Sequence, residues 1–301
     1  MSAECGPVSR IAVIGAGKIG RWIARSLSSF RYDLTVFDVD THALAKEEWK
    51  EIGANTVLLE DGLDDEILAV LRQCSQVFLS VPENPGEELF SALLDRLGSK
   101  SVLIDTFSVK TPVAEIYRNS DSDTVAFGIN PLFRPDPGLT GPMLICRYGD
   151  SSPDTCHLFF ILKANDIFEC EAEIHDRITS VFQGGLHSVV IAYASLLESS
   201  FAKIERNKPL LGTPPSKIMH ALCSRVLSGQ ASTYLATIRG NPHVRENVRV
   251  LCDAMDHLQA MKEEEFVCLY DRLASSLHSD EITTLSDSLV KATLEETPIG
   301  V

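Results

Sequence analysis

The sequence predicts an α/β domain built on a doubly wound parallel sheet, over residues 1–171, followed by an all-α domain over residues 172–301. In the first part, short apolar segments alternate with amphipathic helical patterns, which is typical of parallel strands joined by crossover helices. After residue 171, almost only helical periodicity remains. A chain of 301 residues is long enough for two such domains, each with its own core.

A glycine-rich loop gives the most specific signal. Apolar residues 11–14 predict a buried strand, and the complete G-x-G-x-x-G of residues 15–20 follows at once. Gly15 permits a tight turn, Gly17 leaves room for a pyrophosphate beside the backbone, and Gly20 lets the next helix pack close to the strand. The phosphates then lie on unpaired N–H groups at the helix N-terminus. These features predict a Rossmann-type dinucleotide site.

The second predicted strand, residues 34–37, ends at Asp38. A carboxylate at this position hydrogen-bonds the adenosine ribose and repels a 2′-phosphate, so it favours NAD over NADP. A similar fold that binds another ligand, or none, is the alternative. The expected cofactor-binding residues come from the glycine loop, from Asp38 and from the end of a later strand: Gly15, Gly17, Lys18, Ile19, Gly20, Asp38, Ser80, Val81 and Pro82.

Further apolar segments continue the α/β pattern. The expected strands are residues 55–58, 76–80, 101–105, 124–128, 143–147 and 167–170, and the expected helices are residues 41–52, 64–74, 86–97, 112–117 and 153–163. The alternation predicts that the strands are parallel, and ligands of such sheets bind outside the carboxyl ends of the strands. Residues 80–82, 105–108 and 130–136 are therefore expected to line one crevice with the glycine loop.

The second part of the chain predicts helices only. They are expected at residues 175–200, 217–227, 232–238, 242–266 and 269–278, with a polar tail after them. A helical domain this apolar would leave hydrophobic surface uncovered in a monomer. We therefore expect a homodimer that forms through the C-terminal helices.

Charge and cysteine usage restrict the partners and the compartment. The chain has 27 basic and 42 acidic residues and a net charge of −15, which argues against nucleic acid or an anionic membrane as a partner. The eight cysteines form no C-x-x-C and no metal-ligand spacing with histidine, so we expect reduced thiols in a cytoplasmic protein and no metal site. No signal-peptide pattern or run of 18 apolar residues stands out, so no membrane span is expected.

Three local motifs lie at predicted strand ends and on the long predicted helix. They are D-T-F-S-V-K at residues 105–110, G-I-N-P-L-F-R-P-D at residues 128–136, and His175-Asp176 followed by Gln183 and His187. These motifs resemble the D-x-x-S-V-K, G-x-H-P-M-F-G-P-D and H-D-x…Q…H stretches of the prephenate and arogenate dehydrogenase family. The resemblance implies a Rossmann domain, a helical dimerisation domain, and NAD-dependent oxidative decarboxylation of a small cyclohexadiene substrate.

The same resemblance implies roles for individual residues. Asn130, Ser108 and His187 match catalytic positions, with Ser108 bonding the 4-substituent of the substrate and His187 contacting substrate or cofactor. Ser108 as a helix cap and His187 as a core residue are the alternatives. Arg134, Asp136 and Gln183 are candidates for substrate binding, and for Asp136 plain loop solvation is an equal alternative.

Asn130 is the informative departure, because the family has histidine there. That histidine bonds the ring 4-hydroxyl and takes its proton as the hydride leaves, whereas an amide cannot accept a proton near neutral pH. Three interpretations follow: a non-catalytic NAD-binding protein or another activity; a prephenate or arogenate dehydrogenase with a different base; or a substrate without hydroxyl at C4. The third is favoured, with 4-amino-4-deoxyprephenate as substrate and 4-aminophenylpyruvate as product, a reaction of antibiotic and 4-aminophenylalanine biosynthesis.

A second departure concerns a substrate carboxylate. The family has an arginine about six residues before a D-P or N-P pair, and Ala236 occupies that position before Asn241-Pro242. Arg134 replaces a family glycine and is the candidate for the missing guanidinium, since bidentate carboxylate binding suits arginine. A solvent-facing Arg134, with Arg239 or Arg225 binding instead, is the alternative.

Overall fold

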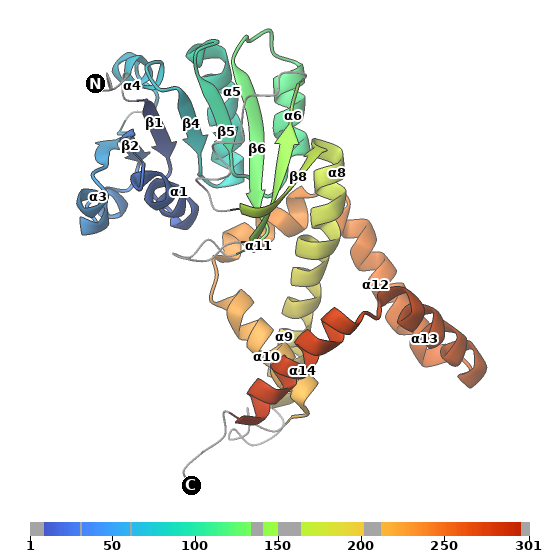
Figure 1. Cartoon of the computed structure of the whole chain (residues 1–301). Helices are drawn as coiled ribbons and strands as arrows, with labels where there is room; N and C mark the ends of the chain where they lie inside the picture. Colours follow the sequence, from blue (N-terminus) through green and yellow to red (C-terminus); the bar gives the residue numbers. More distant parts are fainter. Residues whose placement is uncertain are drawn as a thin grey trace, which may run out of the picture. The chain divides into compact units, whose positions relative to one another are not determined.

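The computed structural model describes residues 9–30, 32–60, 62–133, 141–149, 164–201 and 212–295 (Figure 1). The chain divides into two compact units, residues 1–178 and residues 179–301, which we call the sheet unit and the helical unit. The sequence placed the domain boundary after residue 171, directly before helix α8 (Ala172–Thr179). The division of the structure instead falls near the end of that helix.

The sheet unit contains one eight-stranded sheet in the order β3-β2-β1-β4-β5-β6-β7-β8, and the expected α/β fold class is confirmed. The strands are β1 (Arg10–Ile14), β2 (Asp33–Asp38), β3 (Asn55–Leu58), β4 (Gln76–Leu79), β5 (Val102–Asp105), β6 (Val125–Pro131), β7 (Gly141–Arg147) and β8 (Ala164–Glu171). β1 to β6 are parallel. The order runs outward from β1 on one side and from β4 on the other, so the switch point where ligands bind such sheets lies between these two strands.

One expectation about the sheet was wrong. β7 pairs with β6 in antiparallel register, with Asn130 opposite Leu144, and β8 then runs parallel to β7. The alternation of apolar segments had predicted parallel strands throughout. The physical reason is the connection: residues 132–140 are too few for the crossover of a dozen or more residues that a parallel neighbour requires.

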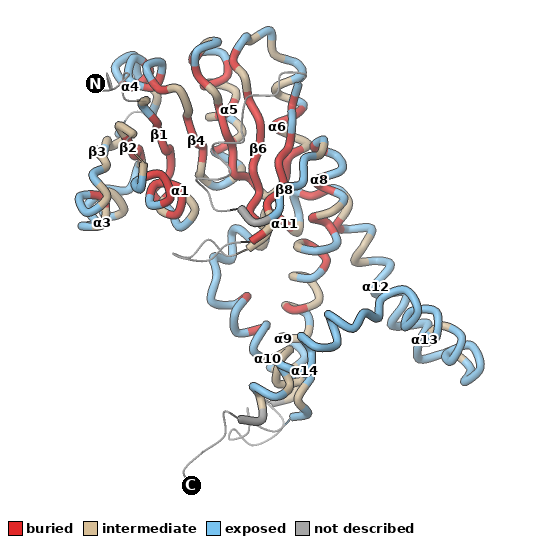
Figure 2. The backbone as a smooth tube through the Cα atoms, viewed as in Figure 1, coloured by how far each residue is buried: buried red, intermediate tan, exposed pale blue. Residues whose placement is uncertain are grey.

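Helices and apolar layers cover the sheet. The described helices of this unit before α8 are α1 (Lys18–Ser28), α2 (Thr41–Leu44), α3 (Glu47–Glu51), α4 (Asp65–Leu71), α5 (Glu83–Leu97) and α6 (Thr111–Arg118). Successive strand residues point to opposite faces, so β1 contributes Ala12 and Ile14 to one buried cluster and Ile11 and Val13 to the other. The strands β1, β4, β5, β6 and β7 are accordingly almost entirely buried, whereas β3 and the described part of β8 are half-buried or exposed (Figure 2).

The helix expected over residues 41–52 is two short helices. Lys46 has extended backbone angles and starts α3, and the Trp49 indole N–H donates to the Ala43 carbonyl at 2.8 Å across the break. The break lets the large Trp49 ring become fully buried. The helix expected over residues 153–163 lies outside the described residues.

The helical unit is built of a π-helical turn, η1 (Ser180–Gly185), and helices α9 (Leu186–Phe201), α10 (Pro214–Leu227), α11 (Ala231–Gly240), α12 (Val244–Ala260), α13 (Glu263–Leu277) and α14 (Asp280–Glu295). The expected all-α second domain is confirmed in the described residues. Two details were wrong: the helix expected over residues 242–266 is broken at Met261 and Lys262, and the expected polar tail forms α14.

The long helix expected over residues 175–200 is present but contains the π turn. A Cβ on Gly184 would come within 2.3 Å of the Val244 side chain, so the turn needs a glycine where the start of α12 packs on it. By length and composition, residues 172–200 could also cross a bilayer. However, His175 and Asp176 near its start are fully buried within the protein, so composition is weak evidence for a membrane span.

Candidate active site

The glycine loop lies at the switch point of the sheet. Gly15 has a φ of +106°, and a Cβ there would meet the Ser80 carbonyl oxygen at 2.1 Å; a Cβ on Gly20 would meet the Gly15 carbonyl oxygen at 1.8 Å. Both positions therefore exclude any side chain. Gly17 instead is exposed, and a Cβ there would have no heavy atom of the described residues within 4 Å. The loop is closely packed on two sides and open at Gly17, the side on which phosphate would approach the N-terminus of α1.

Asp38 does more than the sequence suggested. Its carboxylate accepts the N–H of Ala16 at 2.5 Å and the N–H of Asp40 at 2.8 Å. The side chain thus ties the end of β2 to the glycine loop. Each carboxylate oxygen retains a second lone pair, so these bonds are compatible with a further bond to a ribose hydroxyl.

Ser80, Val81 and Pro82 follow β4, next to the loop. The Ser80 N–H donates to the Ile14 carbonyl at 2.8 Å, which extends the pairing of β1 and β4 past the end of the strand. Pro82 is the residue before α5. The structure therefore brings together these three residues, the glycine loop and Asp38, as expected for the carboxyl ends of neighbouring strands.

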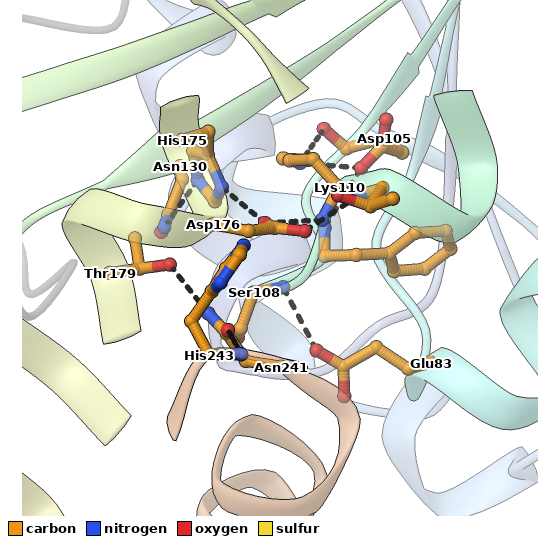
Figure 3. A network of polar contacts seen from close by, with 12 residues as sticks. Glu83, Asp105, Ser108, Lys110, Asn130, His175, Asp176, Thr179, Asn241 and His243 are labelled. Carbon is orange, nitrogen blue, oxygen red and sulfur yellow. Dashed lines mark hydrogen bonds and ion pairs between the residues drawn. The ribbon is translucent and has the colours of Figure 1, made fainter. Parts of the chain in front are cut away.

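The D-T-F-S-V-K motif forms a buried clamp between β5 and β6. The Lys110 ammonium lies 2.5 Å from an Asp105 carboxylate oxygen and donates to the Ile129 carbonyl at 3.1 Å (Figure 3). Tyr148 donates to the other Asp105 oxygen, and burial, followed by the negative charge of Asp105, raises the pKa of Tyr148 well above its usual value. The lysine and aspartate are fully buried, so they hold the strand ends rather than meet solvent.

Ser108 lies between Asp105 and Lys110 in the sequence and is half-buried. Its N–H donates to a Glu83 carboxylate oxygen at 2.9 Å. The alternative role as a helix cap is not seen, because α6 follows Lys110 without a side-chain cap.

A second buried chain of hydrogen bonds reaches Asn130 at the end of β6. The Asn130 amide nitrogen lies 3.0 Å from Nε2 of His175, and Nδ1 of His175 lies 2.8 Å from an Asp176 oxygen. Asp176 also accepts the backbone N–H groups of Lys110 and Thr111, both at 2.8 Å. The sequence matched His175 and Asp176 to the H-D motif at the start of a predicted helix and gave them no contact with Asn130; the motif was the signal that could have placed them here.

Burial and hydrogen bonding set the charge states in this chain. Burial lowers the pKa of His175 below its usual 6.5, although its bond to Asp176 opposes the shift. Burial alone would raise the pKa of Asp176, but the bonds from His175 and from the backbone outweigh it and lower that pKa below 3.8. At neutral pH, a neutral imidazole therefore lies between an ionised carboxylate and the Asn130 amide.

These shifts predict a pH dependence of stability. A histidine whose pKa is lowered by folding contributes stability above its unfolded pKa of about 6.5, and this contribution is lost as the pH falls below that value. Asp176 keeps its contribution to much lower pH, because its folded pKa lies below 3.8. Urea unfolding from about pH 8 to about pH 5 should therefore show a falling free energy of unfolding, and His175→Gln should make the fall shallower. Parallel curves for the two proteins would contradict this.

His187 is a second histidine that is expected to contribute to the same fall. Burial lowers its pKa as well, and its ring packs edge-on against Tyr234 in the helical unit, with ring centres 4.8 Å apart. Within the described residues, its buried Nδ1 atom has no hydrogen-bond partner. His187→Gln should therefore also make the fall in the free energy of unfolding shallower, independently of His175→Gln.

The other candidates fall in the helical unit or outside the described residues. Gln183 is half-buried on η1, and Arg225 and Arg239 are exposed on α10 and α11. Asn241 donates to the Thr179 hydroxyl at 3.2 Å. Arg134 and Asp136, two of the expected substrate-binding residues, lie outside the described residues, and so do Cys5 and Cys156.

The described cysteines and possible metal ligands relate to two expectations, reduced thiols and no metal site. The described cysteines are all free, and Cys74, Cys146 and Cys223 are buried. Among the described residues, no group of three or more histidine, cysteine or acidic side chains could hold a metal ion.

Comparison with known proteins agrees with the motifs. No protein-family model matches the sequence. The chain is 27% identical over 290 residues to the 4-amino-4-deoxyprephenate dehydrogenase of Streptomyces pristinaespiralis, covering 91% of this chain and 94% of that protein. It is 29% identical over 122 residues to the cyclohexadienyl dehydrogenase of Zymomonas mobilis, covering 40% of each.

Solved structures share the fold. The prephenate dehydrogenase of A. aeolicus, in complex with hydroxyphenyl propionate and NAD⁺, superposes with a TM-score of 0.59 at 16% identity over 97% of this chain and 99% of that one. The Synechocystis arogenate dehydrogenase gives a TM-score of 0.57 at 18% identity, over 89% and 98% of the two chains.

A glycine loop at the switch point of a parallel sheet, joined to an acid at the end of β2, defines the Rossmann class of dinucleotide-dependent dehydrogenases. Within that class, the full-length sequence similarity agrees with the three motifs and with the shared fold. The resemblance is thereby confirmed: the chain is similar over most of its length to a 4-amino-4-deoxyprephenate dehydrogenase, and it shares the fold of prephenate and arogenate dehydrogenases.

Proposed function

We propose that this dehydrogenase oxidatively decarboxylates 4-amino-4-deoxyprephenate with NAD⁺, giving 4-aminophenylpyruvate, CO₂ and NADH. Asn130 is the observation that carries the proposal, because it replaces the histidine that takes a proton from a 4-hydroxyl. The full-length relative from S. pristinaespiralis, which is named for this amino substrate, supports the same choice. The reaction belongs to 4-aminophenylalanine and antibiotic biosynthesis.

The chemistry of a neutral amine suits an amide at this position. As hydride leaves C4 for the nicotinamide, the nitrogen lone pair forms a C=N bond, and the positive charge rests on nitrogen. Cleavage of the ring carboxylate then releases CO₂, and its electron pair completes the aromatic ring and returns the lone pair to nitrogen. The substrate reacts as the free amine, after its ammonium form has lost one proton to solvent; the amine then keeps both remaining protons, so no side chain has to accept one. The protein's tasks are to bind, orient and stabilise charge.

Roles for the remaining candidates follow from the family. Ser108 and Asn130 contact the 4-substituent, and His187 contacts substrate or cofactor. Arg134, Asp136 and Gln183 bind the rest of the substrate, with Arg134 opposite a carboxylate. The bound NAD⁺ supplies the hydride acceptor, held by the residues of the glycine loop, Asp38 and the end of β4.

The second candidate function is a prephenate or arogenate dehydrogenase. One observation favours it: the neutral His175 imidazole lies 3.0 Å from Asn130, so a group able to accept a proton is close to the site. A non-catalytic NAD-binding protein is the remaining alternative.

The proposal includes a cytoplasmic homodimer. Apolar side chains of the last three helices are largely exposed in the single chain, as the pale blue α12 and α13 of Figure 2 illustrate. They include Val250, Met255, Tyr270, Leu277, Ile282 and Leu285. A second copy of the chain would cover such surface. Sedimentation equilibrium tests the homodimer directly, because it measures the mass of the protein in solution.

The cofactor preference rests on Asp38. We expect kcat/KM for NAD⁺ to exceed that for NADP⁺ by at least roughly 10-fold, and Asp38→Asn to narrow that ratio because the repelling charge is gone. Asn can still accept one of the two backbone N–H bonds, so the loop should remain folded. Asp40→Asn, an exposed neighbour, is the matched control. An unchanged cofactor ratio in Asp38→Asn would contradict the assignment.

The activity itself is tested by stoichiometry. Purified protein is mixed with NAD⁺ and 4-amino-4-deoxyprephenate, and NADH absorbance, CO₂ release and the aromatic product are measured together. Equal amounts of NADH, CO₂ and 4-aminophenylpyruvate are expected. No turnover of this compound, of prephenate or of arogenate would favour the non-catalytic alternative.

A further inference from the structure

Asn130 has a fixed partner on one side of its amide. The residue is only 6% exposed, and His175 and Asp176 behind it are fully buried. Its amide nitrogen lies 3.0 Å from Nε2 of His175. Within the described residues, no donor contacts its amide oxygen. The two ends of the amide therefore differ in environment.

The directions of the hydrogen bonds follow from Asp176. Its ionised carboxylate already accepts two backbone N–H groups, from Lys110 and Thr111, and can only accept. The 2.8 Å contact with His175 Nδ1 therefore requires a proton on Nδ1. A neutral imidazole carries a single N–H, so Nε2 is an acceptor. Only the nitrogen of the Asn130 amide can donate to it.

The reversed amide is disfavoured in this environment. It would place the Asn130 oxygen against the Nε2 lone pair of His175, so that two buried acceptors face each other and a hydrogen bond is lost. Holding the amide nitrogen inward fixes the oxygen as the group that remains for a ligand. A freely rotating asparagine would present either an acceptor or a donor, and a donor would not pair with a C–NH₂ proton.

We propose that His175 is a positioning residue that fixes the Asn130 amide oxygen toward the ring 4-substituent, where it accepts a hydrogen bond from the substituent and takes no proton from it. This inference rests on the proposed function, and it names the residue that holds the Asn130 amide in the accepting orientation. His175 acts through Asn130 and contacts neither substrate nor cofactor in this role. Asp176 in turn fixes the tautomer of His175.

A double-mutant cycle tests whether His175 acts through Asn130. His175→Leu should lower kcat/KM for 4-amino-4-deoxyprephenate by roughly 10-fold to 100-fold, with the Kd for NAD⁺ unchanged. In an Asn130→Ala background, the same change should have less than about a two-fold effect, because no amide remains to be oriented. His175→Gln should restore most activity, since its amide can accept from Asn130 and donate to Asp176. Multiplicative effects in the double variant would overturn the proposal.

A second measurement needs no turnover. In a ¹⁵N spectrum of histidine-labelled protein near neutral pH, the signals absent from His175→Gln belong to His175. Nδ1 is expected to carry the proton and Nε2 to be unprotonated; a proton on Nε2 would overturn the inference even if the enzyme is active. If the expected tautomer is found but prephenate is the better substrate, the proposed substrate fails while the anchoring of Asn130 stands.

Discussion

Replacing Lys110 with Met should lower the free energy of unfolding by about 3–5 kcal/mol, the largest stability loss we expect from a single substitution that keeps a similar side-chain volume. The Lys110 ammonium is fully buried and lies 2.5 Å from Asp105. Removing it leaves the Asp105 carboxylate buried, with Tyr148 and the Phe107 N–H as donors but no cation. Methionine fills most of the space, so the loss reports the uncompensated charge. Urea unfolding measures it.

The matched control is Lys50→Met. Lys50 forms an ion pair with Glu47 on the exposed face of α3, with both side chains at least 70% exposed. Removing an exposed pair of this kind should change stability by less than about 1 kcal/mol. If Lys110→Met were no more destabilising than Lys50→Met, the buried clamp between β5 and β6 would not have the structural role assigned to it.

Replacing Asn130 with His should reverse the substrate preference. An imidazole at the end of β6 can accept the proton of a 4-hydroxyl, which an amide cannot, and such proton transfer contributes about 10²–10⁴-fold in rate. We therefore expect kcat/KM for prephenate to rise by at least roughly 10-fold and that for the amino substrate to fall. Steady-state NADH formation with both substrates measures the two changes.

Asn119→His provides the control for this exchange. Asn119 is an exposed residue at the end of α6, so the same change of side chain there should leave both substrates unaffected. A histidine at position 130 would lie beside His175, and the two rings would share one buried hydrogen bond. If Asn130→His lowered turnover of both substrates equally, Asn130 would be a structural residue and not the group that distinguishes hydroxyl from amine.

The sequence predicted the parts of the fold that local chemistry determines. The apolar strands, the glycine loop and the acid at Asp38 each follow from residue types at fixed spacing, and the parallel order of β1 to β6 agrees with them. The direction of β7 was missed because an apolar segment has the same pattern in either direction; only the short connection after β6 distinguishes them. The break before α13 depends on Met261 and Lys262, neither of which is a strong helix breaker.

The site was predictable to the extent that motifs were contiguous. Ser80, Ser108 and Asn130 were placed at strand ends, and the structure has them there. The bond from Asn130 to His175 joins residues 45 positions apart. The Tyr148 hydroxyl, directly after β7, donates to Asp105, and Tyr148 belongs to none of the sequence motifs. Such contacts arise from the packing of elements and not from local spacing. They also explain why Lys110, a residue type that is usually exposed, is fully buried.

The most direct test of the account is the ratio of kcat/KM for 4-amino-4-deoxyprephenate to kcat/KM for prephenate in the unmodified enzyme with saturating NAD⁺. The account predicts a ratio above roughly 10, because Asn130 can hold the amine but cannot take a proton from the hydroxyl. A ratio below one would contradict it and would identify the enzyme as a prephenate dehydrogenase that uses another base.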